Sequence, residues 1–382
     1  MEQMSNEYIN TIFCPYRICP LGAHVDHQLG QVTGFAINQG ITLEYTPTEN
    51  GEVDVISKNF PGRVRFNLNN MPEKNFDWGD FVVGAAKVLS ETYNLKKGFE
   101  GVVFGSLPVG GLSSSAAVII TYLNVFCKVN NIHLTRPQMI KYAIKVEREY
   151  IGVNVGKLDQ SCEVYCKKDN LLFLDTYDDS TELIPVNPDM PPFKIAIIYS
   201  GVTRKLATSA YNLRVDECKA SAYALKGYSG MDYGKIADTY LREVPVGIYN
   251  QYKQLLPLNW RKRAHHYYHE QERVKTGIEA WKKGDIKLFG EMINQSGRSS
   301  INYYEAGSEP LKALYEIMMK TDGIYGGRFS GAGFNGCCMA IINPDKQEEI
   351  REFITSEYAK AFPEYMDEFA IYFCETADGI EL

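Results

Sequence analysis

The chain has 382 residues, of which 45% are hydrophobic and 23% charged, an ordinary composition for a globular protein. Chains of this length usually divide their core between domains, so we expect two. The 40 basic and 47 acidic residues give a formal net charge of −7. This charge argues against nucleic acid as the main partner, because phosphate backbones attract basic surfaces.

No secretion signal or membrane segment is expected. Residues 1–10 are polar and lack the apolar core of a signal peptide. The most apolar run, residues 116–126, is interrupted by Thr121 and Asn124 and is far shorter than the ~20 residues that cross a bilayer. The 9 cysteines are scattered without a CxxC pair, which favours reduced structural thiols over zinc ligands or disulfides. We therefore expect a cytoplasmic protein that contacts no membrane, and no sequence feature indicates a protein partner.

Hydrophobic periodicity predicts strands at the start of the chain, helices in the middle and both at the end. Alternating residues around an Asn50-Gly51 turn predict strands over residues 40–57. Apolar residues at helical spacing, such as Phe81 and Ala85, predict helices. The predicted helices cover residues 76–93, 113–129, 138–150 and much of 205–225 and 258–320, and the later strands cover residues 171–174, 194–199, 339–342 and 369–373.

This order of elements predicts an α+β fold rather than regular βαβ alternation. Four prolines fall between residues 185 and 192, which indicates a boundary shortly after them. We expect an N-terminal α+β domain over residues 1–195 and a C-terminal α+β domain over residues 196–382.

The first motif that could carry chemistry is Gly110-Gly111-Leu112-Ser113-Ser114-Ser115-Ala116. The glycines free the backbone to curl, and the serines lead into a helix whose first N–H groups are unpaired. Such a helix start suits phosphate, and serine hydroxyls can add hydrogen bonds or bind Mg²⁺. The alternative is a glycine turn followed by a serine N-cap. The chain has no GxxxxGK[ST] segment, so this is not a Walker A loop.

A second glycine-rich motif, Gly331-Ala332-Gly333-Phe334-Asn335-Gly336, matches the GxGxxG pattern of dinucleotide-binding proteins. In those proteins the pattern follows a strand and opens a helix. Here it runs into the apolar residues 337–342, which predict a strand. The context argues against a dinucleotide site, and leaves either a glycine-rich loop that lines a ligand pocket or a plain turn.

Two polar stretches could supply reactive side chains. Arg17, His24 and Asp26 lie close together in a stretch marked by proline and glycine. Further along, Glu147 ends a predicted helix and Asp159 follows a glycine-containing loop. One of these two carboxylates could hold Mg²⁺, which prefers oxygen ligands, and the other could meet a substrate hydroxyl. The alternatives are a structural Arg–Asp pair in a polar loop and functionless charges at a helix end.

Together these motifs resemble the GHMP kinase superfamily and, within it, the galactokinases and the plant-type galacturonokinases. The resemblance rests on three segments in the family's order: residues 17–28 (RICPLGAHVDHQ), 111–117 (GLSSSAA) and 327–334 (GRFSGAGF). Weaker matches over residues 78–84, 200–211 and 265–304 extend it over nearly the whole chain. The resemblance implies the GHMP kinase fold, in which two α+β domains hold the active site in the cleft between them.

The resemblance also implies roles for individual residues. Asp159 is similar to the catalytic aspartate, with Arg17 beside it, and Glu147 and the loop serine Ser115 are similar to the Mg²⁺ ligands. The implied sugar contacts are Arg17, Ala23, His24, Asp26, Gly156, Asp159 and Tyr211; the implied ATP contacts are Gly110, Gly111, Leu112, Ser113, Ser114, Ser115, Ala116 and Trp78; and the C-terminal glycine motif contains Gly331, Ala332 and Gly333.

Two departures from the galactokinases bear on the substrate. The phosphate loop has one glycine fewer, as in the galacturonokinases, and Ala23 stands where galactokinases place a glutamate against the sugar's C6 hydroxyl. The resemblance thus implies a sugar 1-kinase that uses ATP and Mg²⁺ to phosphorylate the anomeric hydroxyl of D-galacturonate. A galactokinase acting on D-galactose is the alternative. A non-catalytic sensor of sugar and ATP is a third interpretation, and the intact Arg17, Asp159 and serine loop argue against it.

Overall fold

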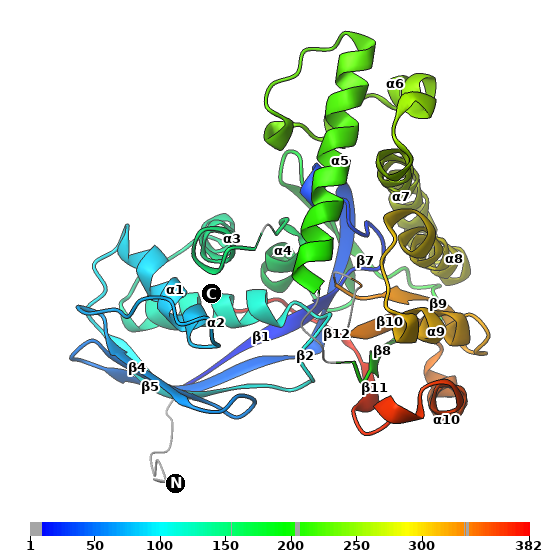
Figure 1. Cartoon of the computed structure of the whole chain (residues 1–382). Coiled ribbons are helices and arrows are strands. Elements are labelled where there is room, and N and C mark those ends of the chain that lie inside the picture. Colours follow the sequence, from blue (N-terminus) through cyan, green and yellow to red (C-terminus); the bar gives the residue numbers. More distant parts are fainter. Residues whose placement is uncertain (1–9, 154, 203–206, 332, 334–335) are drawn as a thin grey trace.

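The structure is a computed structural model that describes residues 10–153, 155–202, 207–331, 333 and 336–382, with the side chains of residues 207–210 left aside. Figure 1 shows two sheets that lie side by side, each with helices packed on it, and a helical arm that rises away from both. The expected α+β fold is confirmed.

The first sheet is built around β2 (Gln31–Thr48), a strand of 18 residues. Its order is β4-β3-β5-β2-β6-β7, and β1 and β12 pair with β2 as well. The start of β2 pairs with β6 and its end with β5, so one strand serves both halves of the sheet. The other strands are β1 (Asn10–Ile18), β3 (Glu52–Ser57), β4 (Arg63–Asn67), β5 (Gly98–Gly105), β6 (Asn170–Asp175), β7 (Ser180–Pro185) and β12 (Thr376–Ala377).

Four helices lie over this sheet: α1 (Asp80–Ser90), α2 (Ser114–Val129), α3 (Arg136–Lys145) and α4 (Leu158–Tyr165). Helices α2 and α4 pack on its strands, and α1 and α3 pack on these helices. Helix α2 contacts α1, α3, α4, β1, β2 and β5, which explains why it is apolar on nearly all sides. Among the described residues, no helix is long and apolar enough to cross a membrane. Helix α4 lies very close to β2, since a Cβ atom on Gly34 would be 2.1 Å from the sulfur of Cys162.

The second sheet has the order β11-β8-β10-β9. Its strands are β8 (Lys194–Ser200), β9 (Ile324–Phe329), β10 (Cys337–Ile342) and β11 (Phe369–Cys374), and the accompanying helices are α5 (Ala207–Ser229), α6 (Val246–Tyr252), α7 (Leu258–Lys282), α8 (Ile286–Ser299), α9 (Glu309–Met318) and α10 (Gln347–Ala361). Helix α8 packs on β9 backbone to backbone, because a Cβ on Gly326 would lie 2.1 Å from the carbonyl oxygen of Gly290.

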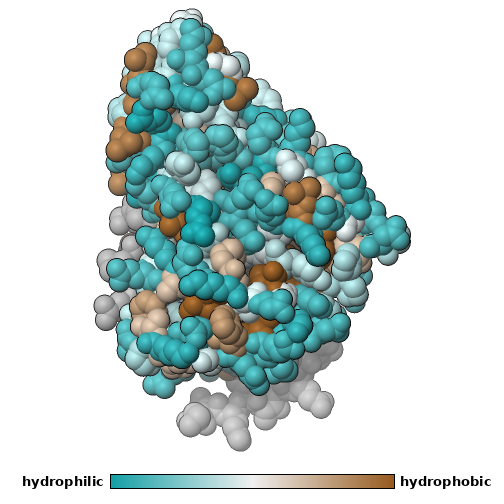
Figure 2. Space-filling model, turned by 90° about the vertical axis from the view of Figure 1, so that its right-hand side faces the viewer, coloured by the Kyte–Doolittle hydropathy of each residue, from teal (hydrophilic) through white to brown (hydrophobic). Residues whose placement is uncertain are grey.

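Helices α8 and α9 in the second half of the chain are amphipathic. Figure 2 shows a largely hydrophilic face in which hydrophobic side chains form small, separate patches. The apolar side of α8, with Phe289 and Ile293, is buried instead. The exposed face therefore matches the charged sequence of residues 258–320, and the core lies between the helices and the sheets.

Most predicted elements are confirmed, and the differences have local causes. The helix expected at residues 76–93 begins only at Asp80, because the Asp80 carboxylate accepts hydrogen bonds from the N–H groups of Asn75 and Phe76 and fixes a turn there. The domain boundary at residue 195 stays a prediction. The chain changes sheets between Pro185 and Lys194, but β12 returns from the second sheet to pair with β2.

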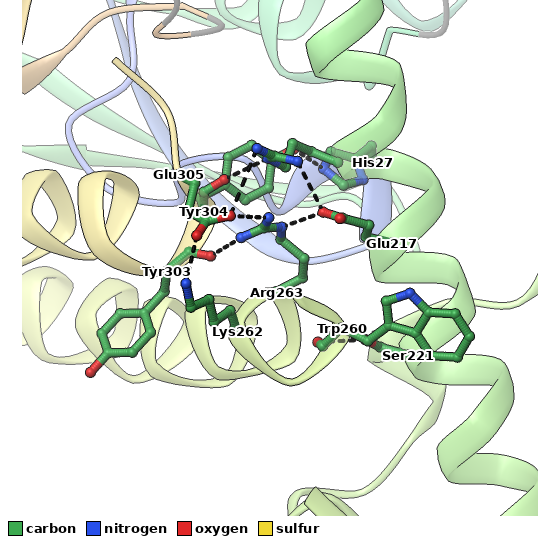
Figure 3. Close-up of polar contacts among 10 residues, drawn as sticks. His27, Glu217, Ser221, Trp260, Lys262, Arg263, Tyr303, Tyr304 and Glu305 are labelled. Atoms are coloured by element: carbon green, nitrogen blue, oxygen red, sulfur yellow. Dashed lines mark hydrogen bonds and ion pairs between the residues drawn. The ribbon is translucent and has the colours of Figure 1, made fainter. Parts of the chain in front are cut away.

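A network of buried and half-buried charges ties α5 and α7 to the segment that follows α8 (Figure 3). Arg263 is fully buried, and its guanidinium donates to the carboxylates of Glu217 and Glu305, each at 2.6 Å, and to the carbonyl of Tyr303. Lys262 also donates to Glu305, at 2.5 Å. The two cations hold the pKa of Glu305 at about 2. Because the side chains of Arg263 and Glu217 are buried away from water, these ion pairs hold α5 and α7 together.

We predict that Arg263→Met lowers the free energy of unfolding by about 3 kcal/mol, because it leaves the carboxylates of Glu217 and Glu305 without their main shared cation. Arg214 remains near both carboxylates and keeps the loss at the low end of the range for such pairs. Urea denaturation is the measurement. Arg261→Met, on the same helix but less buried, is the control, and an equal loss in both variants would contradict the role of the network.

Candidate active site

The centre of the site is an ion pair between the first strand and the fourth helix. Arg17 on β1 donates from Nε to Oδ1 of Asp159, in the first turn of α4, at 2.7 Å. Arg17 is only 4% exposed, and its Nη1 also donates to the carbonyl of Gly111 at 3.1 Å. Burial disfavours the charged guanidinium, but Asp159 outweighs this and holds the pKa of Arg17 above its usual value. The pair thus joins two segments that lie 142 positions apart to the predicted phosphate loop.

The predicted phosphate loop has the backbone shape that its glycines allow. Gly110 and Gly111 have φ angles of 133° and 85°, and Ser113, just before α2, has 58°. The Ser113 hydroxyl does not cap the helix and donates instead to the second carboxylate oxygen of Asp159. The first N–H groups of α2 are therefore left without a side-chain cap, which is the arrangement that suits an anion.

The two glycine-rich motifs lie directly against each other. A Cβ atom on Gly331 would meet the Cα of Gly111 at 2.9 Å, and one on Gly336 would meet the carbonyl carbon of Gly110 at 2.8 Å. Ser330 donates from its hydroxyl to the carbonyl of Gly111 at 2.6 Å. The second motif therefore supports the phosphate loop and leads into β10, and it opens no helix.

The side chain of Glu147, from the helical turn after α3, lies against the start of α2 and is suited to bind a cation. Glu147 is 3% exposed and accepts a hydrogen bond from Ser115 at 3.0 Å and another from Gln160. Burial and the charge of Asp159 raise the pKa of Glu147 to about 7. The described residues contain no group of three His, Cys, Asp or Glu side chains that could hold a metal ion. One carboxylate and one hydroxyl fit Mg²⁺, which keeps waters and shares phosphate oxygens rather than requiring a full protein cage.

Beside Asp159 opens a cavity of about 460 Å³, which we call the polar cavity. Asp26 reaches it from a short helical turn and lies against Gly156, where a Cβ would be 1.8 Å from the Asp26 carboxylate. Only glycine fits at that position. Burial and the charge of Asp159 raise the pKa of Asp26 to about 6. The cavity is lined by Arg17, Cys19, Ala23, His24, Asp26, Val153, Val155, Gly156, Leu158, Asp159, Tyr211, Arg328 and Gly331.

Two histidines next to the polar cavity stay neutral. Burial, with neighbouring cations, holds the pKa of His24 well below its usual value and lowers that of His27 to about 3. The ring of His24 stacks on Tyr304 with centroids 4.1 Å apart. His27 shares a hydrogen bond of 3.1 Å with the hydroxyl of Tyr304, a contact visible in Figure 3. Rings on the second half of the chain thus hold this wall of the cavity.

A smaller cavity of about 180 Å³, which we call the apolar cavity, shares Ser114 and Ser115 with the phosphate loop. Trp78 and Phe81 line it, and the indole nitrogen of Trp78 donates to the carbonyl of Pro61 at 2.9 Å. This contact fixes the indole ring. A flat, apolar group next to a phosphate-binding loop would fit the arrangement.

The structure brings most of the predicted site residues together and adds others. Ala332 lies outside the described residues, and Gly333 packs against Phe329 rather than lining the polar cavity. Sequence reasoning missed Arg328, whose only signal was its place beside the glycine motif. It also missed Glu270 on α7, which accepts hydrogen bonds from the N–H groups of Gly22 and Ala23 and carries no local signal.

Comparison with known proteins agrees with this geometry. Residues 80–167 match the N-terminal domain of GHMP kinases and residues 278–360 match the GHMP kinase C-terminal region. The first match spans the phosphate loop, Glu147 and Asp159. The second spans the C-terminal glycine motif.

Similar proteins match over nearly the full chain. A galacturonokinase of Arabidopsis thaliana is 37% identical over 97% of this chain and 93% of its own. A galactokinase of Clostridium perfringens is 32% identical over 94% of this chain and 92% of its own. The structure of Lactococcus lactis galactokinase complexed with galactose superposes with a TM-score of 0.89, at 28% identity, over 99% of this chain and 96% of its own. The chain therefore belongs to the GHMP kinase family and has its fold.

Proposed function

We propose that the chain is an ATP-dependent sugar kinase that phosphorylates the anomeric hydroxyl of D-galacturonate. The observation that carries the proposal is the cluster of Arg17, Asp159 and Ser113, because it joins a loop suited to phosphate to a cavity suited to a sugar. The 37% identity with a galacturonokinase supports the substrate, and so does the small side chain of Ala23 in the cavity wall.

In the proposed reaction, the carboxylate of Asp159 accepts the proton of the C1 hydroxyl as its oxygen attacks the γ-phosphorus of ATP. The bond from the γ-phosphorus to the bridging oxygen breaks, and ADP leaves. Arg17 orients Asp159 through its Nε and stabilises negative charge at the reacting atoms. Phosphoryl transfer depends mainly on such positioning and charge stabilisation, which this fixed pair supplies.

ATP would bind across the phosphate loop. The N–H groups at the start of α2 would hold its phosphates, and the apolar cavity beside Trp78 would take the adenine ring. Ser115 and Glu147 would hold Mg²⁺, which supplies neutralisation of the phosphate charge when bound. The hydroxyl and carboxylate oxygens are ligands of the kind that Mg²⁺ prefers.

A galactokinase acting on D-galactose is the second candidate, favoured by the likeness to Lactococcus lactis galactokinase. Ala23 argues against it. Alanine offers no acceptor to a C6 hydroxyl, and it removes the charge that a glutamate would set against a C6 carboxylate. A non-catalytic sensor is a third candidate, and release of ADP in the presence of sugar would exclude it.

We predict that Asp159→Asn lowers kcat by about 10²–10⁴-fold, the usual effect of removing a general base. The variant should still fold and bind ATP, because asparagine preserves the shape of the side chain, but its melting temperature should fall, because the buried guanidinium of Arg17 loses its anion. Coupled measurement of ADP release is the assay. Asp179→Asn, which removes an exposed partner of Lys157, is the control. Wild-type turnover in a folded Asp159→Asn variant would show that Asp159 is not the base.

We predict that Mg²⁺ is required and that its apparent affinity depends on pH through Glu147. The raised pKa of about 7 means that Glu147 is protonated below this pH, so the Mg²⁺ affinity should fall by about tenfold per pH unit there. EDTA should stop the reaction. Glu147→Gln should weaken Mg²⁺ binding and abolish this pH dependence, whereas Glu149→Gln, on the exposed side of the same turn, should retain it. An unchanged pH profile in Glu147→Gln would rule out this ligand.

We predict that Ala23→Glu loses activity on D-galacturonate first, because it returns a negative charge to the place where the substrate's carboxylate would lie. The measurement is kcat/KM for D-galacturonate and D-galactose in wild type and variant. Polar contacts built for a specific group can discriminate by about 10⁴–10⁵-fold, so the ratio of the two values should reverse. A wild type that prefers D-galactose would contradict the proposal that D-galacturonate is the substrate.

A further inference from the structure

Arg328 is a buried cation in the wall of the polar cavity that has no negatively charged partner. It lies on β9 and is 2% exposed, and its Nη1 donates to the carbonyl of Cys19 at 3.0 Å. Its Nε has no hydrogen-bond partner among the described residues. No described carboxylate lies within 4.0 Å of it, the limit that defines an ion pair here.

The other buried arginines of the described chain show how unusual this is. Arg17 pairs with Asp159, and Arg263 pairs with Glu217 and Glu305, as Figure 3 shows. An arginine side chain does not escape the cost of burial by losing its proton, so a buried guanidinium is normally compensated by an anion. No described carboxylate forms an ion pair with Arg328, and an anionic ligand in the cavity would supply one.

The carboxylate of Glu270, whose charge interacts with that of Arg328, is fully engaged elsewhere. Its Oε1 accepts from the N–H groups of Gly22 and Ala23 and from the hydroxyl of Ser296, at 2.8, 3.0 and 2.7 Å. Its Oε2 accepts from Arg273 at 2.7 Å. Burial would raise the pKa of Glu270, but Arg273, His266 and Arg328 together hold it at about 2. Glu270 therefore interacts with Arg328 only through its charge, and forms no hydrogen bond or ion pair with it.

A second unpartnered group lies in the same wall. The Nε2 of His24 is buried and has no hydrogen-bond partner in the described part of the chain. Because His24 is neutral, one of its ring nitrogens carries a proton. Ala23, the residue before His24, lines the same cavity and contributes only a methyl group. Two polar groups and a small residue in one cavity thus offer a place for a substrate anion, whereas an anion placed beside Asp26 or Asp159 would be repelled.

We propose that Arg328, assisted by His24, binds the C6 carboxylate of the sugar acid and sets the preference for D-galacturonate over D-galactose. This inference rests on the proposed function, since it names the group that recognises its substrate. A guanidinium can hold a carboxylate through two parallel hydrogen bonds, and the exchange of an unpaired buried charge for a paired one favours binding of the charged sugar. A neutral C6 hydroxyl offers no such compensation.

The test compares Arg328→Met and Arg328→Lys with wild type on both sugars. Arg328→Met should lower kcat/KM for D-galacturonate by about 10²–10³-fold and leave that for D-galactose within about threefold. Arg328→Lys keeps the charge but loses the planar fork, and its loss should be intermediate. D-galacturonate alone, without ATP, should raise the melting temperature of wild type and not that of Arg328→Met.

The melting temperature of the ligand-free protein distinguishes a role of Arg328 in substrate binding from a role in stability. Because Arg328 has no ion pair to break, Arg328→Met should melt within about 5 °C of wild type, unlike Arg263→Met. An equal loss on both sugars, or a melting temperature as low as that of Arg263→Met, would overturn the proposal. So would a variant that still prefers D-galacturonate. If wild type itself prefers D-galactose, the substrate assignment fails instead.

Discussion

The ion pair between Arg17 and Asp159 is the interaction on which the arrangement of the site depends. It links β1 to α4 at 2.7 Å, and the same guanidinium holds the carbonyl of Gly111. Ser113 donates to the other oxygen of Asp159. A strand, a helix start and a phosphate loop are thus fixed by one buried cation. Because Arg17 is buried and Asp159 is only partly exposed, the geometry of the pair is held more firmly than that of a surface ion pair.

The second constraint is the close approach of the two halves of the chain at glycine. Gly331 and Gly336 contact the backbone of Gly110 and Gly111 at distances that leave no room for a side chain. This contact lets β9 and β10 of the second sheet reach the site. It also carries Arg328 to the wall of the polar cavity, 309 positions from its partner Cys19. The site is therefore assembled from both halves of the chain, although Arg17 on β1 and Asp159 on α4 both come from the first half.

The sequence predicts the parts of the site that have a local pattern. Paired glycines before serines identify the phosphate loop, and a carboxylate after a glycine-containing loop points to Asp159. Arg328 and Glu270 could not be found in this way, because their roles arise from contacts between segments far apart in the chain. The start of α1 was misjudged for a related reason, since the side-chain bonds of Asp80 override helical periodicity. Motifs with a local pattern can thus be predicted from the sequence, whereas the pairing of buried charges depends on the tertiary structure.

The identity of the phosphorylated product tests the central claim most directly. Incubation of the protein with ATP, Mg²⁺ and D-galacturonate, followed by phosphorus NMR of the product, reports which hydroxyl received the phosphate. The account predicts one new sugar phosphate whose phosphorus signal is split by the anomeric proton, as expected for a 1-phosphate formed next to Asp159. Phosphate on another hydroxyl would contradict it, as would transfer to D-galactose without transfer to D-galacturonate.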